Sequence, residues 1–579
     1  MAITKVTGAL LGNYTGGSAD DTVVVGDGAG DAITTGVDNT LIGDNAGTAL
    51  TEGSNNVAIG NEALASNTTG SRNVAIGYAS LDAATTAVNN TAVGNSSLSA
   101  NTSGTSNAAF GRNAMLANTE GSNNTAIGMG ALDANTTADH NTALGLQALG
   151  ANTTGEYNIG IGSYSLYDNT TGGSNVSIGY NTLANNTTAS NNTAVGYLAL
   201  TTNTTGADNT AVGKTALNSN TTGADNTALG GSAMYANTTG GQNVAIGVGS
   251  LDANTTASQN TAVGGLSLTA CTTGGENTAV GYNALAANTT ATENVAVGRY
   301  ALAANTTGLY NVALGESALA ANTTADNNTA LGRRALLTST TAYECTAVGN
   351  HAGYNITTGY SNTCVGKNAG DQLTTGTHNV MIGHNSGSHN ANVTTGGDNV
   401  FIGNFASGSS ASASRQIALG YNAQCVANDT ITIGIGSNTA SLSLNGSDES
   451  WAANSDERLK ENIQDSSAGL SFVNDLRPVT FNWKKAKDVP SDMAEYIEGS
   501  EEPAMGHEYG VTYHGFIAQE VKETIDKHPE IKDGFGMWQE TDSGTQRIAK
   551  GSVVTMLVKA VQELSAQVEE LKAQINEEK

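Results

Sequence analysis

Proline and tryptophan are missing from the first 450 residues of this 579-residue chain, and all four prolines and three tryptophans lie in the last 129 residues. Aromatic residues make up 5% of the sequence and charged residues 13%, whereas glycine occupies 72 positions. A single large core needs bulky apolar side chains, so their scarcity excludes an ordinary large globular domain over the first 450 residues. It favours a repetitive architecture of small, closely packed side chains, with a domain boundary near residue 450.

Basic residues are scarce as well. The first 450 residues contain nine Lys and Arg against 27 Asp and Glu, and the net charge of the whole chain is −28. Phosphate binding needs clustered basic side chains, so nucleic acid is not an expected partner. No run of about 20 apolar residues would cross a membrane, and the first 17 residues lack the apolar core of a secretory signal. We therefore expect no membrane insertion and a protein that stays in the cytoplasm of the cell that makes it until release.

Residues that bind metals or react with substrates are also sparse. The four cysteines form no CxxC pair, and no cluster of His and carboxylate residues stands out, so we expect neither a metal nor a cofactor. Cys271 and Cys345 replace the Asn that is usual at their repeat positions, and Cys364 replaces an Ala; we expect them to be small core fillers, with a Cys345–Cys364 disulfide as the alternative. No paired acids suggest glycan hydrolysis, and no aromatic stripe marks a polysaccharide groove along the repeats.

A glycine recurs every 17 residues, from Gly26 to Gly383. One unit reads N-[TV]-A-[VIL]-G-x-x-A-L-x-x-N-T-T-[GA]-x-x. Its first segment alternates with the period of two that is typical of a strand, "xALxxN" provides a second apolar pair, and "NTT" followed by Gly or Ala predicts a turn. We therefore expect two short strands per unit and no helix in this region.

A unit of 17 residues cannot bury its apolar side alone, so neighbouring units must stack. At about 4.8 Å per coil, 22 coils form a parallel β-solenoid rod of roughly 105 Å. We place this rod at residues 22–450, after an N-terminal attachment segment at 1–21. Asn at one fixed position predicts a ladder of side-chain amides from coil to coil. The side of the strand that carries only Ala and Gly would allow close contact with other copies of the chain.

Two of the repeats, "NVAIGNEAL" (56–64) and "NVAIGYASL" (73–81), resemble the heads of trimeric autotransporter adhesins. Those heads are β-rolls built from N-x-x-A-[IV]-G-x-x-[AS] units that are three residues shorter than the repeat in this chain. The resemblance implies a homotrimer.

The composition changes after Trp451, and four ordered blocks follow. These are S-D-x-R-L-K-x-N-I (455–463), L-R-P-V-x-F-x-W (476–483), H-G-F-I-A-Q-E-V (514–521) and a final helical stretch. Together they resemble the endosialidase-type intramolecular chaperone, an α+β auto-processing domain at the C-terminus of many phage tailspikes and tail fibres. The resemblance implies that residues 451–579 direct trimer folding and are then removed by self-cleavage.

In that family a Ser–Lys dyad cuts the chain at the start of the domain, and the motif carries these roles to Ser455 and Lys460. The cleavage site would then involve Asn454, Ser455 and Asp456, with either side of Ser455 as the cut. A Ser hydroxyl needs a base, which a Lys of lowered pKa supplies within the chain or from a neighbouring one. In the alternative interpretation Ser455 is a helix N-cap, with Asp456 in the first turn. His514 is expected to be a hydrogen-bonded core residue rather than a catalyst.

The last block has apolar residues at alternating steps of three and four, from Val554 to Ile575. This heptad pattern predicts a coiled coil over about residues 552–577. The alternative is an amphipathic helix that packs on its own domain.

These patterns together predict a structural, host-receptor-binding tail fibre or appendage of a bacteriophage. We expect it to be made in the host cytoplasm, to end up in the virion, to attach to other tail or virion proteins through its N-terminus and to bind a surface glycan or protein receptor of the host. Its only chemistry would be self-cleavage. A cell-surface trimeric adhesin with a chaperone tail is the alternative. A folding domain is physically useful because nearly identical coils can pair out of register at little cost.

Overall fold

The computed structural model describes residues 21–443, 452–453, 461–491, 493, 496–504, 510–531, 536–540, 546–549, 551 and 553–578. The chain divides into two compact units, residues 1–454 and 455–579, and each is described by itself. All but the last residue of the expected attachment segment lies outside the described residues.

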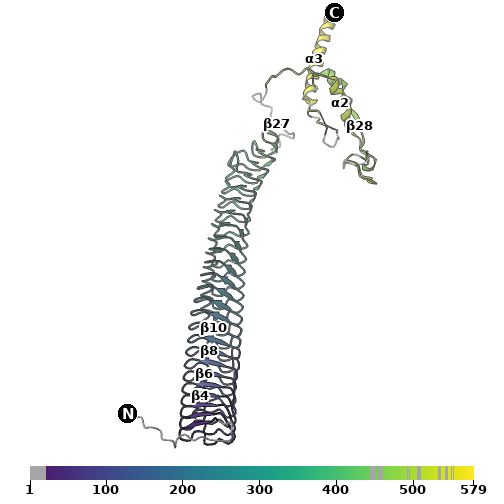
Figure 1. Ribbon diagram of the computed structural model, residues 1–579. Helices are drawn as coiled ribbons and strands as arrows, with labels where there is room; N and C mark the ends of the chain where they lie inside the picture. Colours follow the sequence, from purple (N-terminus) through teal and green to yellow (C-terminus); the bar gives the residue numbers. More distant parts are fainter. Residues whose placement is uncertain are drawn as a thin grey trace. The chain divides into compact units, whose positions relative to one another are not determined.

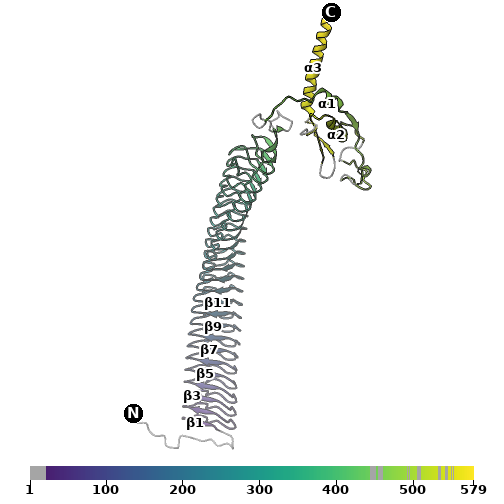
Figure 2. The same cartoon turned by 45° about the horizontal axis from the view of Figure 1, so that its top comes forward.

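The first unit is a parallel β-solenoid in which each 17-residue coil contributes one strand of three residues, which confirms the predicted fold. Figures 1 and 2 show these coils stacked one on another from β1 onward. Each strand pairs in register with the strand one repeat away, for example Thr210 with Thr227. The strands of the regular coils are β1 (Val23–Val25), β2 (Thr40–Ile42), β3 (Val57–Ile59), β4 (Val74–Ile76), β5 (Thr91–Val93), β6 (Ala108–Phe110), β7 (Thr125–Ile127), β8 (Thr142–Leu144), β9 (Ile159–Ile161), β10 (Val176–Ile178), β11 (Thr193–Val195), β12 (Thr210–Val212), β13 (Thr227–Leu229), β14 (Val244–Ile246), β15 (Thr261–Val263), β16 (Thr278–Val280), β17 (Val295–Val297), β18 (Val312–Leu314), β19 (Thr329–Leu331), β20 (Thr346–Val348), β21 (Thr363–Val365), β22 (Val380–Ile382) and β23 (Val400–Ile402).

The prediction of two strands per coil is wrong. The segment after each glycine consists of turns, because its Leu adopts a left-handed backbone, with φ of 52° at Leu217 and 51° at Leu285. Hydrogen bonds between coils nevertheless continue through this segment: the Leu217 N–H donates to the Ala233 carbonyl oxygen at 2.9 Å. The coils are therefore bonded to one another beyond the short strand.

The interior of each coil is filled by two apolar side chains. The middle residue of the strand, such as Ala228, and the Leu of the following turns, such as Leu217, are fully buried. The expectation that the Ala and Gly side faces other copies is therefore wrong. A narrow coil that already encloses a Leu leaves room for only a small residue opposite, so Ala points inward and its two strand neighbours point outward.

The repeated glycine is required by both backbone angle and space. Gly230 has a φ of +137°, and a Cβ added there would lie 2.5 Å from the Gly247 carbonyl oxygen of the next coil. Other residues rarely adopt this φ, and no side chain fits against that carbonyl. This explains why the glycine returns with every coil.

Two ladders of buried asparagines follow the rod, where the sequence predicted one. In the first, the Asn before each strand accepts a backbone N–H from the next coil: the Asn226 N–H donates to Asn209 Oδ1 at 3.1 Å. In the second, formed by the Asn of the "NTT" turn, Asn220 Nδ2 donates to Asn203 Oδ1 at 2.8 Å and to the Gly223 carbonyl oxygen at 2.9 Å. The ladders satisfy polar groups inside the coils that water cannot reach.

The solenoid ends in an antiparallel hairpin. Strand β24 (Gln416–Leu419) pairs in parallel with β25 (Thr430–Ile435), but β25 pairs antiparallel with β26 (Asn438–Ser443), which pairs with β27 (Ala452–Ala453). The change of direction gives the last coil a partner and so covers its open edge.

The second unit is a small α+β domain. Its elements are α1 (Leu470–Asp475), β28 (Val479–Phe481), the 3₁₀ helix η2 (Ala486–Asp488), β29 (Tyr513–Gly515), α2 (Ala518–Lys527), β30 (Trp538–Glu540), β31 (Gln546–Ile548) and α3 (Val553–Glu577). The core is formed by Ala468, Phe472, Leu476, Val521, Ile525, Ile531, Met537 and Met556.

Candidate functional site

The predicted dyad, Ser455 and Lys460, and the predicted cleavage residues Asn454 and Asp456 lie outside the described residues, so their geometry stays a prediction. The structure describes the end of their motif, Glu461–Ile463. The boundary between the two compact units falls between residues 454 and 455.

The second and third motif blocks of the C-terminal domain lie together. Strand β28 pairs antiparallel with β29, so that Val479 lies opposite Gly515. Beside this pair, Arg477 Nε donates to Glu520 Oε2 at 2.9 Å, and Arg477 Nη2 donates to Glu520 Oε1. The guanidinium holds the pKa of Glu520 below its usual value. The two blocks therefore form one local structure, which short-range sequence patterns do not reveal.

Of the histidines of this domain, His514 is exposed and His528 is buried. His514 lies on the exposed side of β29, so the expectation that it is a core residue is wrong. His528, at the C-terminal end of α2, is the buried one, with 9% of its side chain exposed. A histidine in "KHPE" gives no sequence signal of burial, because it lies between charged residues.

The His528 ring links two acidic groups. Its Nδ1 lies 2.8 Å from Glu530 Oε1 and its Nε2 lies 2.9 Å from Asp475 Oδ2. Two carboxylates favour the form in which both nitrogens carry a proton, so these hydrogen bonds, first that to Glu530 and then that to Asp475, raise the pKa of His528. The ring also meets Phe472 edge to face at 5.4 Å between centroids. This arrangement joins the ends of α1 and α2 and is structural.

Helix α3 contacts its own domain through side chains that are not part of its heptad seam. Met556 and Ala560 are buried, and Glu563 Oε2 accepts the Leu470 N–H at 2.7 Å at the start of α1. The heptad side chains are 41–62% exposed; they are Val554, Leu557, Val561, Leu564, Val568, Leu571 and Ile575. From residue 564 to the end of the helix every side chain is exposed. The helix therefore packs on its domain near its start, and its apolar seam stays exposed among the described residues.

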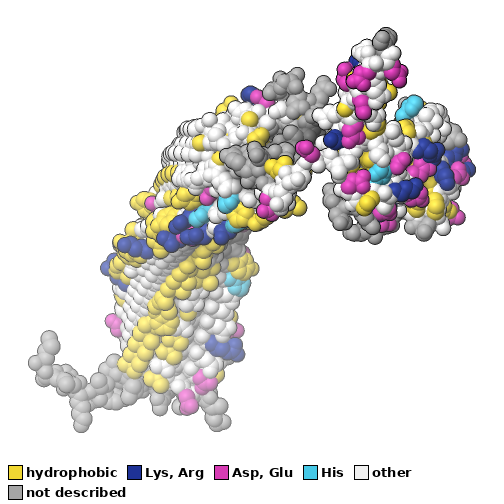
Figure 3. Space-filling view, turned by 90° about the horizontal axis from the view of Figure 1, so that it is seen from above, with side chains coloured by type: hydrophobic (Ala, Val, Ile, Leu, Met, Phe, Trp, Pro, Cys, Tyr) yellow, Lys and Arg dark blue, Asp and Glu magenta, His cyan; other side chains and the backbone are white. Residues whose placement is uncertain are grey.

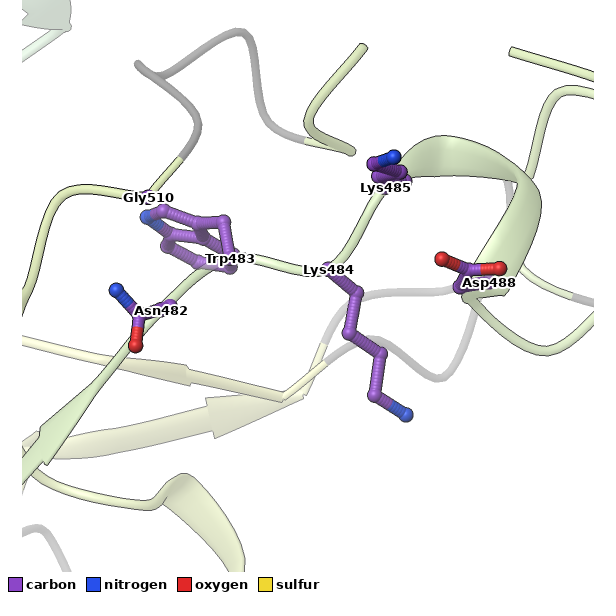
Figure 4. Close-up of a pocket in the computed structure, with 6 residues that line it drawn as sticks. All are labelled: Asn482, Trp483, Lys484, Lys485, Asp488 and Gly510. Carbon is purple, nitrogen blue, oxygen red and sulfur yellow. The ribbon is translucent and has the colours of Figure 1, made fainter. Parts of the chain in front are cut away.

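A shallow hollow of about 400 Å³ lies beside β28 and η2. Figure 4 shows the Trp483 ring next to Gly510, with Asp488 well apart from it. Lys485 lies in this lining and pairs with Glu501, whose pKa falls to about 2 through hydrogen bonds from Lys485 and Lys487. The described residues that line the hollow include no serine, cysteine or histidine.

On the rod, all four cysteines are buried and unpaired, which rules out the Cys345–Cys364 disulfide in this structure. Burial raises the pKa of the Cys271 thiol to about 11. Cys271 and Cys345 stand where Asn is usual, as the sequence predicted. The structure places Cys345 in the first ladder and Cys271 in the second, and each cysteine interrupts its ladder.

The rod has a local cluster of tyrosines on three consecutive coils. Tyr180 and Tyr197, each 50% exposed, stack with 5.6 Å between ring centroids, and Tyr164 meets Tyr180 edge to face at 6.4 Å. Tyr167 adds an edge contact to Tyr164 at 5.7 Å. The signal was present in the sequence, because Tyr180 and Tyr197 directly follow the glycines of consecutive coils.

Within the described part of the chain, no group of three His, Cys, Asp or Glu residues is placed to hold a metal ion. No described helix is long and apolar enough to span a bilayer.

Comparison with known proteins gives one family match. Residues 455–528 match the protein family described as chaperone of endosialidase. A search of curated proteins finds no match to the chain. The matched range starts at Ser455 and includes α1, β28, β29 and α2. The C-terminal unit thus contains a chaperone-of-endosialidase domain, attached to a β-solenoid of 17-residue coils.

Proposed function

We propose that this protein is a homotrimeric fibre or appendage of a bacteriophage tail, whose C-terminal domain directs trimer folding and then cuts itself off. The observation that carries this proposal is the apolar seam of α3 in a chain that also contains a chaperone-of-endosialidase domain. Fourteen residues of this helix, 564–577, are all exposed in the described part of the chain. Isolated helices shorter than about 12–15 residues are marginal in water, so this segment needs partner helices.

The folding role follows from the symmetry of the rod. Each coil offers the next nearly the same strand, so copies that align by their rods alone can pair one coil out of step. A non-repetitive domain with its own core sets the three chain ends at the same height before the coils form. Removal of this domain afterwards traps the rod kinetically, since the released chain has lost the part that aligned it.

For the cut itself we propose Ser455 as nucleophile and Lys460 as base. The neutral Lys amine accepts the hydroxyl proton while Ser455 Oγ attacks the carbonyl carbon of the adjacent peptide bond. The C–N bond breaks, the leaving amine takes up a proton, and water hydrolyses the resulting ester. The start of the family match at Ser455 and the boundary between the compact units at residues 454 and 455 support this position.

Mass spectrometry of the full expressed chain tests the cut. We expect two fragments that meet next to Ser455, and intact chains from Ser455→Ala and Lys460→Ala. The matched controls are Ser467→Ala and Lys484→Ala, which replace exposed residues of the same domain and should leave the cut unchanged. Normal cleavage of Ser455→Ala would rule out the dyad, and a native mass of one chain would rule out the trimer.

We further propose that the tyrosine cluster (Tyr164, Tyr167, Tyr180 and Tyr197) contributes to binding a host surface glycan. Exposed phenol rings offer apolar faces and polar hydroxyls at one place on the rod, as a sugar ring requires. In this proposal the N-terminal segment attaches the fibre to other virion proteins. Binding of the trimer to arrayed bacterial surface polysaccharides should fall at least tenfold in Tyr180→Ala/Tyr197→Ala and persist in Tyr78→Ala, an equally exposed tyrosine of a distant coil. Equal binding by all three proteins would refute this site.

A further inference from the structure

The outward side of the solenoid strands has at least one apolar side chain in every coil over the whole length of the rod. In every strand from β1 to β23 the third residue is Val, Ile, Leu or Phe, and the first is Thr, Val, Ile or Ala. Many of these side chains are 36–43% exposed, among them Phe110, Leu229, Ile246 and Leu314. Figure 3 shows hydrophobic side chains gathered in a band along the rod. We call this surface, formed by the first and third residues of β1–β23, the strand face.

The strand face is large enough to form one side of a protein–protein interface. At about 4.8 Å per strand the strand face is about 110 Å long, and two residue steps make it about 7 Å wide, which gives about 770 Å² per chain. The largest apolar patch on a typical monomer is about 300–600 Å². One side of a stable protein–protein interface is about 800 Å². The strand face is therefore as large as one half of an interface.

Charge is absent from the strand face and present at its two margins. None of the strands β1–β23, all of them described, contains Lys, Arg, Asp or Glu. Glu276 and Glu293 lie two residues before a strand, and Arg299 lies two residues after one. An apolar centre with a polar rim is the usual anatomy of a protein interface.

The shape of the strand face restricts which binding partner can cover it. It is a narrow strip of small, largely β-branched side chains that repeats at every coil, with the same spacing for more than 20 coils. A partner must match this length and this period, and a second copy of the rod does both.

We propose that the strand faces of three copies pack against one another and form the shared apolar core of the fibre. This inference rests on the proposed trimer and adds the surface that holds the rods together. It reverses the orientation expected from the sequence, because the Ala side closes the coil of a single chain and the Val, Ile and Leu side joins the chains.

Cross-linking of full-chain variants with one introduced cysteine tests this surface. The native thiols are buried, so a bismaleimide reagent reports on the introduced cysteine. Leu229→Cys lies on the strand face, and Thr239→Cys, the matched control, lies in the exposed Thr-Thr turn of the same coil. We expect chains of Leu229→Cys to form covalent dimers at least tenfold more than those of Thr239→Cys. Ile246→Cys in the next coil provides a second test if the first variant misfolds, which far-UV circular dichroism would show.

The native mass separates the two ways in which the inference can fail. A trimer that is cross-linked through Thr239→Cys, or through neither position, would refute the strand face as the interface and leave the proposed function intact. A native mass of one chain would refute both.

Discussion

Replacing Cys271 by Asn should stabilise the rod, because the structure shows what this cysteine interrupts. The second asparagine ladder is continuous from Asn101 to Asn254, and the next position is Cys271. The Asn254 side-chain oxygen is consequently buried without a hydrogen-bond partner. On the other side, Asn288 Nδ2 donates to the Ala291 carbonyl oxygen of its own coil at 3.1 Å, but its ladder partner is the Cys271 sulfur, at 3.9 Å. The same defect recurs where Ser339 follows Asn322, whose Oδ1 also lacks a partner.

The expected gain can be worked out from the neighbouring coils. An Asn at position 271 would donate to Asn254 Oδ1 and accept from Asn288 Nδ2, as its counterparts do at 2.7–2.8 Å between Asn220, Asn237 and Asn254. Its donation to the Gly274 carbonyl oxygen would replace the bond that the thiol makes at 3.1 Å. Two added neutral hydrogen bonds contribute about 1 kcal/mol each, less the cost of burying a larger polar side chain. We expect a net gain of about 1–2 kcal/mol.

Native-state hydrogen exchange is the suitable assay, since stability in a solenoid is the sum of local and nearest-neighbour terms. A gain of about 1–2 kcal/mol slows exchange by a factor of roughly 5–30. The slowing should be confined to peptides that cover the coils around position 271 and be absent around β5, far along the rod. The matched control is Cys271→Ser, which removes the thiol but is too short to rejoin the ladder.

The result that would refute this reasoning is also measured in the coils around position 271. If Cys271→Asn exchanges no more slowly than Cys271→Ser, the ladder bonds contribute nothing to stability, and the recurrence of Asn would need another cause.

Three further predictions concern the coil, the domain core and the seam. Gly230→Ala should destabilise the rod by at least about 2 kcal/mol in limited proteolysis, because its Cβ would meet the carbonyl of Gly247, whereas Gly231→Ala, with open space around the added carbon, should not. Because the pKa of His528 is raised, the stability that it contributes is complete below its unfolded pKa of about 6.5 and is lost as pH rises through the folded value. The tryptophan-detected melting temperature of the second unit should therefore fall from pH 6 to 8, and His528→Gln should flatten this slope. Leu564→Glu should abolish trimer assembly measured by native mass, whereas the isosteric Leu564→Met should preserve it; assembly of the Glu variant would show that the seam is not an interface.

Much of the C-terminal site was out of reach of sequence patterns. The motif blocks could be recognised, but their contact through Arg477 and Glu520 joins residues 43 positions apart. The burial of His528 likewise depends on Asp475 and Phe472, which lie on another helix. Contacts between residues far apart in the sequence produce no periodic pattern. The tyrosine cluster of the rod does follow such a pattern, because its tyrosines lie in consecutive repeats.

Periodicity by itself determined the rod of this protein. A glycine every 17 residues specifies the length of a coil, because no other residue fits the left-handed turn beneath the next carbonyl, and a recurring Asn specifies a ladder. Alternation along a strand specifies two faces, but it does not say which of them is covered. Only the tertiary structure decided that the interior of a coil has room for Ala opposite Leu and that Val, Ile and Leu must point out. It likewise decided that α3 contacts its own domain through Met556 and Ala560, which leaves the heptad seam exposed.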